Sequence, residues 1–339
     1  MKYFFVNLLL KVFYKLPIWF LNIFFRKSHY IRDNYLDQQA NVFLKLIGIF
    51  GYKPNINDFN HKERLQTNFA RISLSLTKKP QSTFSFKDLN IGQSSELIAR
   101  EYTPDSIKSQ KVMLYFHGGG YALGSIDTHH DFVSLLANKL GIKIYSLEYS
   151  LSPENKYPRA LKEAEYAYNW LLNQGFDNSD VLFCGDSAGA HLAASLSFVL
   201  ADGNKPMPSA QLLIYPMVSP TLQFESMDLY KEDFLLTRAS MEWFWGQLSA
   251  KHDDNSDPMF NLLKQDKQKY SHTRSLIITA GFDPLCDEGH HYADLLEKNG
   301  NIVKKLHFPD LFHGFVNFTN LTGSKKAVKV IIKEFRDFL

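Results

Sequence analysis

The sequence predicts an α/β fold in which helices cover both faces of a mostly parallel, doubly wound central sheet. From residue 112 onward, short apolar runs alternate with longer stretches that carry the spacing of amphipathic helices. This alternation is typical of βαβ units, whose right-handed crossovers place consecutive strands in one sheet. The expected strands are VMLYF, IKIYSLEY, VLFCG, AQLLIYP and SLIITAG, and the expected crossover helices are HDFVSLLANKLG, RALKEAEYAYNWLLNQG and SAGAHLAASLSFVLAD.

Composition narrows the class of protein. With 339 residues, of which 45% are hydrophobic, the chain can bury a large core. Its 38 basic and 35 acidic residues give a net charge of +3, and no interior basic run predicts a nucleic-acid interface. The two cysteines, Cys184 and Cys286, cannot form a disulfide framework, and neither has the sequence spacing of a zinc site. We expect two reduced, buried thiols.

The first 26 residues are more apolar and aromatic than the rest. Lys11 and Lys15 interrupt the apolar run and no small-residue cleavage site follows, which argues against a signal peptide and a transmembrane helix. On a helical wheel the polar residues share about a third of a turn, a pattern typical of a helix lying in a membrane interface, here bent at Pro17. Docking on the protein's own apolar surface, or in a dimer contact, is the other interpretation. These polar residues are Asn7, Lys11, Lys15, Asn22 and Arg26.

Changes of pattern define the expected domains. Residues 31–78 carry two helical stretches separated by GYKPNINDFN, and FSFKDLNI and ELIAREYTP then alternate as strands do. Later, a charged and aromatic stretch with helical spacing (EDFLLTRASMEWFWGQLSA) interrupts the alternation of strands and helices. We therefore expect an apolar segment at residues 1–30, the first part of a helical cap at 31–82, a core at 83–216 and 274–339, and a cap insertion at 217–273.

A nucleophile is predicted at Ser187. The stretch VLFCGDSAGAHLAAS reads as a strand, a tight turn and a helix, and the turn has the form G-x-S-x-G. Small residues at Gly185 and Gly189 allow a sharp turn that exposes the serine hydroxyl above the sheet. The helix amino terminus favours developing negative charge, which suits acyl transfer.

A second motif, HGGG, follows the strand VMLYF. Its glycines, Gly118 to Gly120, can bring backbone N–H groups close to a substrate oxyanion, and the Ala188 N–H can complete that site. A phosphate cradle is disfavoured because neither a Gly-Lys-Ser/Thr sequence nor G-x-G-x-x-G is matched here.

A serine hydroxyl needs a base, and the base needs an orienting acid. His313 follows the last expected strand, and Asp283 follows SLIITAGF, with Asp287 and Glu288 as competing acids. The chain order of serine, acid and histidine is the one that this sheet topology produces when each lies at the carboxyl end of a strand.

The other candidate residues receive supporting roles. His117 is expected to hold the glycine loop, and Asp186 to support the nucleophile turn. We interpret His191 as a packing or hydrogen-bonding residue, His290 and His291 as solvent or cap contacts, and His307 as a strand residue. His129 and His130 are expected to be an exposed loop pair, with contact to substrate as the alternative.

Five motifs in order resemble the hormone-sensitive lipase family of α/β-hydrolases: HGGGYALGS, YSLSPENKYPRALKEA, GDSAGAHLAAS, DPLCDEG and HGF. The resemblance runs from about Phe84 to the C-terminus, and more loosely through 31–78, where that family builds its cap. It departs at Ala190, where the family often has glycine, and in residues 1–30, which the family usually lacks. It implies an α/β-hydrolase fold with Ser187 as nucleophile, Asp283 as acid, His313 as base, and Gly118, Gly119 and Ala188 as oxyanion donors.

The expected function is hydrolysis of hydrophobic, short-to-medium acyl esters through an acyl-enzyme, with no cofactor and no metal. Two alternatives stay open: a non-catalytic ligand-binding protein on the same scaffold, which the retained His313 disfavours, and a membrane-surface lipid hydrolase or deacetylase. The expected partner is a small-molecule ester, with no nucleic acid, and the expected location is the cytoplasm, peripheral at a membrane if residues 1–26 bind one. A homodimer is also open.

Overall fold

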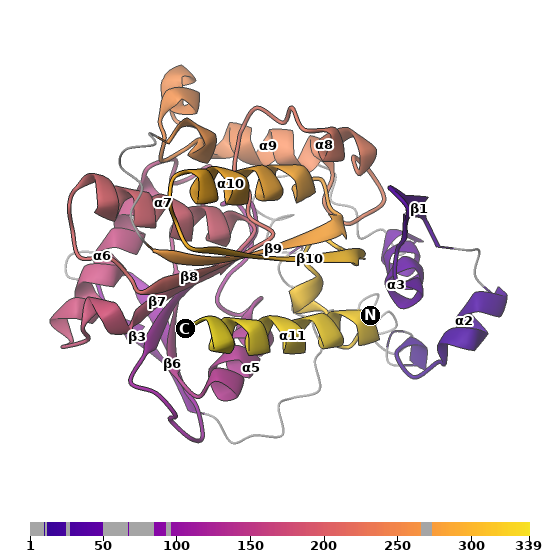
Figure 1. Cartoon of the computed structure of the whole chain (residues 1–339), viewed down its shortest axis with the longest axis horizontal. Coiled ribbons are helices and arrows are strands. Elements are labelled where there is room, and N and C mark those ends of the chain that lie inside the picture. Colours follow the sequence, from indigo (N-terminus) through magenta and orange to yellow (C-terminus); the bar gives the residue numbers. More distant parts are fainter. Residues whose placement is uncertain are drawn as a thin grey trace.

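The computed structural model describes residue 10, residues 12–24, 28–49, residue 67, and residues 85–92, 96–265 and 273–339. In these ranges an eight-stranded sheet runs through the molecule with helices on both faces, as the sequence predicts (Figure 1). The second helical stretch expected before residue 82 falls almost entirely outside the described residues.

The sheet has the order β10-β9-β8-β7-β5-β6-β4-β3. The six strands from β10 to β6 are parallel to their neighbours, whereas β4 is antiparallel to both β6 and β3. A parallel sheet of this kind needs both faces covered, and β5, β7 and β8 are buried along their whole length. The strands are β3 (Ser85–Asn90), β4 (Ile98–Thr103), β5 (Val112–Phe116), β6 (Lys143–Glu148), β7 (Val181–Asp186), β8 (Ala210–Ile214), β9 (Arg274–Phe282) and β10 (Val303–Phe312).

The crossover helices divide between the two faces. Helices α5 (His130–Leu140) and α11 (Thr322–Phe338) pack together on one face, and α6 (Arg159–Asn173), α7 (Ala188–Asp202) and α10 (Cys286–Lys298) cover the other (Figure 1). The three crossover helices expected from the sequence are α5, α6 and α7. Each parallel connection therefore returns the chain to the same end of the sheet, so that the loops after the strands gather at the carboxyl edge.

The connection between β8 and β9 contains α8 (Glu225–Leu229), α9 (Arg238–Leu248) and two short 3-10 helices, His252–Ser256 and Leu262–Lys264. Residues 266–272 of the same connection lie outside the described part. Met241, Phe244 and Trp245 of α9 are buried, so these apolar side chains pack inward. Figure 1 shows α8 and α9 stacked beyond α10, away from the sheet.

The N-terminal part contains α2 (Ile18–Phe24), a two-stranded ribbon of β1 (Tyr30–Ile31) and β2 (Asn34–Tyr35), and α3 (Gln38–Ile49). Arg32, in the ribbon turn, joins two distant elements. Its guanidinium Nη1 lies 2.6 Å from Asp287 Oδ1 on α10, and its Nη2 lies 2.6 Å from Glu225 Oε2 on α8. The ribbon therefore bridges the α8 region and the core.

The apolar N-terminal segment is divided between core and solvent. Leu10 and Phe13 are 4% exposed and Leu21 is fully buried, whereas Trp19 and Ile23 are 65% and 67% exposed. One side of the segment thus packs on the protein itself, mainly against α3. Within the described residues, no helix combines the length and the apolar character that a bilayer crossing requires.

Candidate active site

Ser187 occupies a strained turn between β7 and α7. Its φ of 54° lies in the left-handed region, which a residue other than glycine adopts at a cost. A Cβ on Gly185 would lie 2.3 Å from the Gly189 carbonyl, and a Cβ on Gly189 would lie 2.0 Å from the Phe116 carbonyl oxygen. Both glycines are therefore required for the helix to start this close to β5, and the turn aims the serine hydroxyl away from the sheet.

The three residues expected to form a relay lie in hydrogen-bond contact. His313 Nε2 is 3.0 Å from Ser187 Oγ, and His313 Nδ1 is 2.8 Å from Asp283 Oδ2. Each residue comes directly after the carboxyl end of a strand: Ser187 follows β7, Asp283 follows β9 and His313 follows β10. Asp283 is fully buried, while Ser187 and His313 keep 8% and 7% exposure. The Ser187 hydroxyl is thus the solvent-facing end of this series of hydrogen bonds.

The structure distinguishes Asp283 from its two competitors. Asp283 also accepts a hydrogen bond from the Leu285 N–H at 2.8 Å, which fixes its carboxylate toward the histidine. Asp287 instead binds Arg32, and Glu288 accepts the Val218 N–H at 2.6 Å. Only Asp283 of the three contacts the imidazole within the described residues.

The Gly118 N–H, which the sequence assigns to an oxyanion, donates in this structure to the buried Asp186 carboxylate at 2.9 Å. The N–H groups of Gly119, Gly120 and Ala188 donate to no acceptor among the described residues. Gly119 and Gly120 line the same cavity as Ser187, whereas Gly118 does not. The free donors beside the hydroxyl are therefore those of the second and third glycines and of Ala188.

Asp186 connects the nucleophile turn to the glycine loop. It is 2% exposed, and Tyr115 Oη donates to its Oδ1 at 2.7 Å. His129 Nε2 lies 3.3 Å from the same oxygen. Burial alone would raise the pKa of Asp186, but the adjacent His129 and the hydrogen bonds from His129, Tyr115 and the Gly118 N–H lower it well below its usual range. A fixed negative charge thus anchors the glycine loop from behind.

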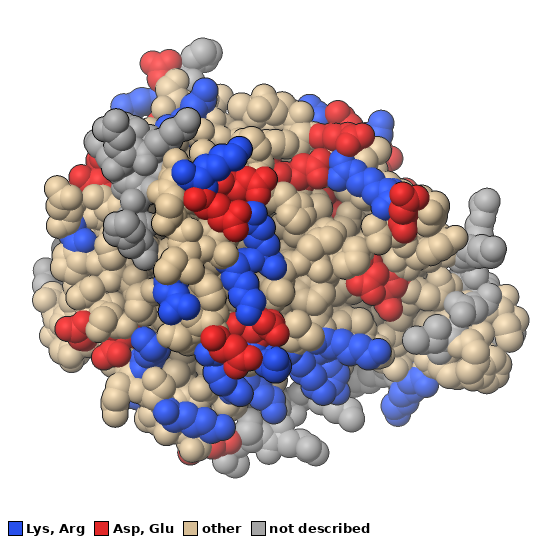
Figure 2. Space-filling model, viewed as in Figure 1, with Lys and Arg blue, Asp and Glu red and all other residues tan. Residues whose placement is uncertain are grey.

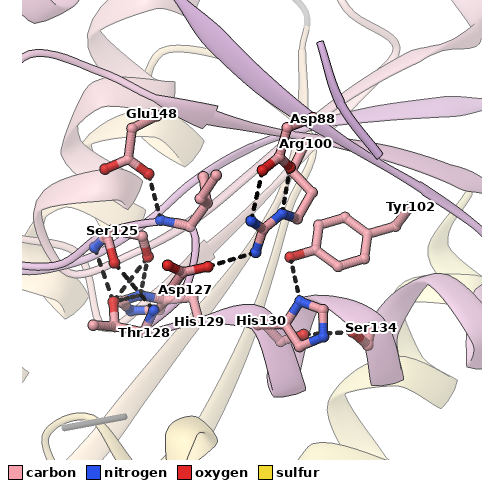
Figure 3. Close-up of polar contacts among 11 residues, drawn as sticks. Asp88, Arg100, Tyr102, Ser125, Asp127, Thr128, His129, His130, Ser134 and Glu148 are labelled. Atoms are coloured by element: carbon pink, nitrogen blue, oxygen red, sulfur yellow. Dashed lines mark hydrogen bonds and ion pairs between the residues drawn. The ribbon is translucent and has the colours of Figure 1, made fainter. Parts of the chain in front are cut away.

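His129 was expected to be exposed, but it is 4% exposed, because the loop that carries it folds back over β5. Figure 3 shows how this loop is held. Arg100 on β4 binds Asp127 at 2.7 Å and Asp88 on β3 at 2.6 Å. One residue after Asp127, the Thr128 hydroxyl lies 2.8 Å from His129 Nδ1. The imidazole that faces Asp186 is therefore positioned from the sheet's antiparallel edge.

Three further histidines, His117, His191 and His130, make structural contacts. His117 stacks on Tyr149, with ring centroids 4.3 Å apart, and its Nδ1 lies 3.0 Å from the Gly118 carbonyl oxygen, so it holds the glycine loop as expected. His191 bonds the Tyr121 hydroxyl at 2.7 Å and the Phe260 carbonyl at 2.9 Å, which fits its predicted hydrogen-bonding role. His130 is half-buried and bonds the Tyr102 hydroxyl at 3.1 Å (Figure 3).

Ser187 and His313 open into a cavity of about 1130 Å³. The cavity lies between α3, the start of α9 and the glycine loop. Its apolar wall includes Leu44, Ile47, Leu236, Phe244 and Phe318, and its charged residues include Lys45, Lys231, Glu232, Arg238 and Glu242. Walls of this mixed type suit a ligand with an apolar body and polar ends.

Phe244 is one of four lid aromatics, with Phe234, Trp243 and Trp245, that the sequence associates with a hydrophobic pocket, and it is the one that lines the cavity. A Cβ on Gly120 would lie 2.2 Å from its ring, so the phenyl group rests directly on the third glycine. The aromatic character of the α9 sequence indicated a lid, but a single sequence gave no sign of which ring reaches the glycine loop.

Comparison with known proteins gives a consistent result. A family model described as an alpha/beta hydrolase fold matches residues 113–317. Carboxylic ester hydrolase LipN of Mycobacterium tuberculosis is 34% identical over 259 residues, which cover 73% of this chain and 69% of that protein. Ethyl acetate hydrolase of Pseudomonas putida is 32% identical over 246 residues, covering 70% of this chain and 77% of that protein.

Solved structures with the same fold include an ester hydrolase from the metagenome of Lake Arreo. It has a TM-score of 0.79 and 28% identity, and the match covers 88% of this chain and 99% of that one. A hyperthermophilic esterase from Pyrobaculum calidifontis has a TM-score of 0.77 and 28% identity, with 89% and 98% covered.

Glu288 leads to a prediction about pH. Burial raises its pKa from 4.5 to about 8, so the folded state holds this proton more tightly than the unfolded chain does. The resulting stability is complete below about pH 4.5 and is lost as the pH rises toward 8. Glu288→Gln, which imitates the protonated side chain, should therefore gain stability relative to wild type between pH 5 and 8, by at most about 1.4 kcal/mol per pH unit.

Urea unfolding of both proteins at several pH values measures this difference. Glu232→Gln, at an exposed position, is the matched control and should follow the wild type. A constant difference between Glu288→Gln and wild type across this range would show that Glu288 does not titrate there.

Proposed function

Because the chain belongs to the hormone-sensitive lipase-like family of α/β-hydrolases, we infer that it is a serine carboxylic ester hydrolase whose nucleophile is Ser187. The observation that carries this assignment is the continuous chain from the Ser187 hydroxyl through His313 to Asp283, with contacts of 3.0 and 2.8 Å at the floor of the cavity. The substrate is a small-molecule ester.

In the proposed mechanism the His313 Nδ1–H donates to Asp283, which leaves Nε2 free to accept the serine proton. Ser187 Oγ attacks the ester carbonyl carbon, and the carbonyl oxygen becomes an oxyanion. His313 then returns the proton to the departing alkoxide, so that an alcohol leaves and an acyl-enzyme remains. Water, deprotonated by the same imidazole, attacks the acyl carbon. The imidazolium returns this proton to the Ser187 oxygen as the acyl–oxygen bond breaks, so the serine hydroxyl is regenerated and the carboxylic acid leaves.

The proposed oxyanion donors are the N–H groups of Gly119, Gly120 and Ala188. All three are free of acceptors among the described residues, and Ala188 begins α7, where the helix dipole adds to the effect. Donors of this kind are worth roughly 10²–10³ each in rate. Asp186 holds the loop that carries the two glycines by accepting the neighbouring Gly118 N–H.

We propose that residues 31–82 and 217–273 together form a cap over the core at 83–216 and 274–339. The cavity is lined from both cap parts, by α3 on one side and by the start of α9 on the other. An apolar cavity wall supports esters with a hydrophobic short-to-medium acyl chain, and the Phe244 ring beside Gly120 would limit the space next to the reacting carbonyl.

A location at a membrane surface is supported by the exposed side chains of the N-terminal segment. Val12, Trp19 and Ile23 are 55%, 65% and 67% exposed, and Ile49 at the end of α3 is 76% exposed and also lines the cavity. Because α2 packs on α3, these apolar side chains belong to one N-terminal unit that borders the site. We propose that this unit lies on a lipid surface with the cavity beside it.

The role of Ser187 is tested by Ser187→Ala. Turnover of p-nitrophenyl butyrate should fall by about 10⁶, because both attack and acyl transfer need this oxygen. The wild type should be labelled by a fluorophosphonate and the variant should not. Wild-type protein that neither turns over esters nor accepts the label would favour the non-catalytic ligand-binding alternative, and turnover retained in a folded Ser187→Ala protein would exclude the mechanism.

Acyl-chain preference is tested by Phe244→Ala. Removing the ring beside Gly120 should raise the ratio of kcat/KM for the octanoate ester over the acetate ester by about tenfold, the value of one or two additional buried methylenes. Trp243→Ala is the control, because Trp243 contacts the same ring but does not line the cavity. An unchanged ratio in Phe244→Ala would mean that the acyl chain binds elsewhere.

Membrane association is tested by co-sedimentation with vesicles of phosphatidylcholine and phosphatidylglycerol. The double variant Trp19→Glu and Ile23→Glu should partition at least about tenfold less than wild type, because two large apolar side chains are lost from the interface. Val330→Glu, at an exposed apolar position on α11, should partition as wild type does. Equal partitioning of the double variant and wild type would contradict the proposal.

A further inference from the structure

Three side chains with metal-binding atoms meet outside the cavity. Cys286, His290 and His307 each offer one ligand atom, and these atoms all lie within 4.8 Å of one another. We propose that this cluster is a transition-metal site, with zinc(II) as the fitting ion, that clamps α10 to the edge strand β10. The proposal is independent of the ester hydrolysis assigned above.

The fold brings these residues together from two directions. Cys286 and His290 are four residues apart on α10, so they lie on one face of the helix. His307 lies on β10, where its Cα partner on β9 is Thr279. These residues do not form a zinc motif along the sequence, because the pairing of β10 with β9, and not a local turn, brings His307 to the other two.

Close packing of α10 on the sheet makes the cluster compact. Gly289 lies between the cysteine and histidine positions, and a Cβ there would come within 2.9 Å of the Thr279 methyl group. The absence of a side chain at Gly289 thus lets the helix sit directly over β9. The Thr279 hydroxyl lies 3.2 Å from His290 Nε2 and 2.9 Å from His307 Nδ1, so both imidazole nitrogens point to a common centre.

The donor set selects the metal. One thiolate and two imidazoles are a combination that zinc favours, at about 2.3 Å for sulfur and about 2.0–2.1 Å for nitrogen. Tetrahedral bonds of those lengths place ligand atoms roughly 3.5 Å apart, so the three atoms need to close by about 1 Å. His307 is exposed and His290 half-buried, and their ring torsions provide this movement, while Cys286 is 4% exposed and fixed. Water or the Thr279 hydroxyl can take the fourth position.

The surrounding charge does not oppose a cation. Asp287 and Asp294 act on His290 as negative charges, and Lys305 and Arg32 act on it as positive ones. Arg32 is itself paired with Glu225 and Asp287. Lys305, the basic residue nearest along β10, is balanced by Asp294 at 2.6 Å. Acidic and basic side chains alternate over the face formed by α10 and β10, without a broad basic field (Figure 2). On binding, the Cys286 thiol would release its proton to solvent as the metal–sulfur bond forms.

A clamp here would join an edge strand to the helix that follows Asp283. β10 pairs with β9 on one side only, and His313 comes directly after it. The Cys286 N–H donates to the Asp283 carbonyl oxygen at 3.0 Å. A bound metal would therefore restrain both strand ends that carry the acid and the base.

The test is titration of the full-length protein, freed of metal with a chelator, with cobalt(II) as a spectroscopic substitute for zinc. The expected result is one equivalent bound, with a thiolate-to-cobalt charge-transfer band. Cys286→Ser should remove the band, and Cys286→Ser and His307→Gln should each weaken binding by about tenfold or more. The control is His291→Gln, which removes an exposed histidine next to the cluster and should bind as wild type does.

The clamp is tested separately by thermal unfolding with zinc(II). At a free concentration 100-fold above Kd, the wild-type Tm should rise by about 3–4 °C, and the Tm of His307→Gln should rise much less at the same concentration. His307→Gln changes an exposed side chain, so its folding is not in question, and circular dichroism verifies Cys286→Ser. Binding without the sulfur band, equal affinity in wild type and both cluster variants, or absence of the Tm rise would each overturn the proposal.

Discussion

The turn between β7 and α7, which has no room for a Cβ at Gly185 or Gly189, determines the geometry of the site. Because Gly185 and Gly189 have no Cβ, α7 can begin in contact with the Phe116 carbonyl at the end of β5. This contact brings the serine turn against the glycine loop that follows β5. It also places Asp186, the residue before the serine, within reach of the Gly118 N–H. The nucleophile and the donors that face its substrate are thus arranged by one steric requirement.

Buried carboxylates near the strand ends differ in what they do because their partners differ. Asp186 is surrounded by donors, so its charge is stabilised and it anchors the glycine loop. Asp283 divides its oxygens between the Leu285 N–H and His313, which orients the imidazole. Glu288 is fully buried and keeps a raised pKa although the Val218 and Ser219 backbone N–H groups lower it, because the cost of burying its charge is larger.

The sequence predicts the sheet and the hydrogen-bonded chain of serine, histidine and aspartate because both depend on local pattern. Strand and helix alternate, and each residue of that chain follows a strand directly. The sequence does not reveal which N–H groups of the glycine loop are free to bind an oxyanion. Gly118, Gly119 and Gly120 are equivalent in the sequence until the position of Asp186, which accepts the Gly118 N–H, is known. His129 was misjudged for the same reason: it is buried, and the loop before it is held by an ion pair between Arg100 and Asp127, which come from separate elements. Contacts that arise only from the packing of distant strands leave no mark on one sequence.

The double contact of Arg32 has a consequence for how the molecule responds to its surroundings. The guanidinium holds Glu225 and Asp287 at the same time, and its side chain is 34% exposed, so dissolved ions can reach it. Screening shortens the reach of such charges from about 8 Å at physiological ionic strength to about 3 Å at 1 M. Rising salt is therefore expected to loosen the N-terminal ribbon from α8 and α10. The mobility of the elements around the cavity would then depend on the ionic strength.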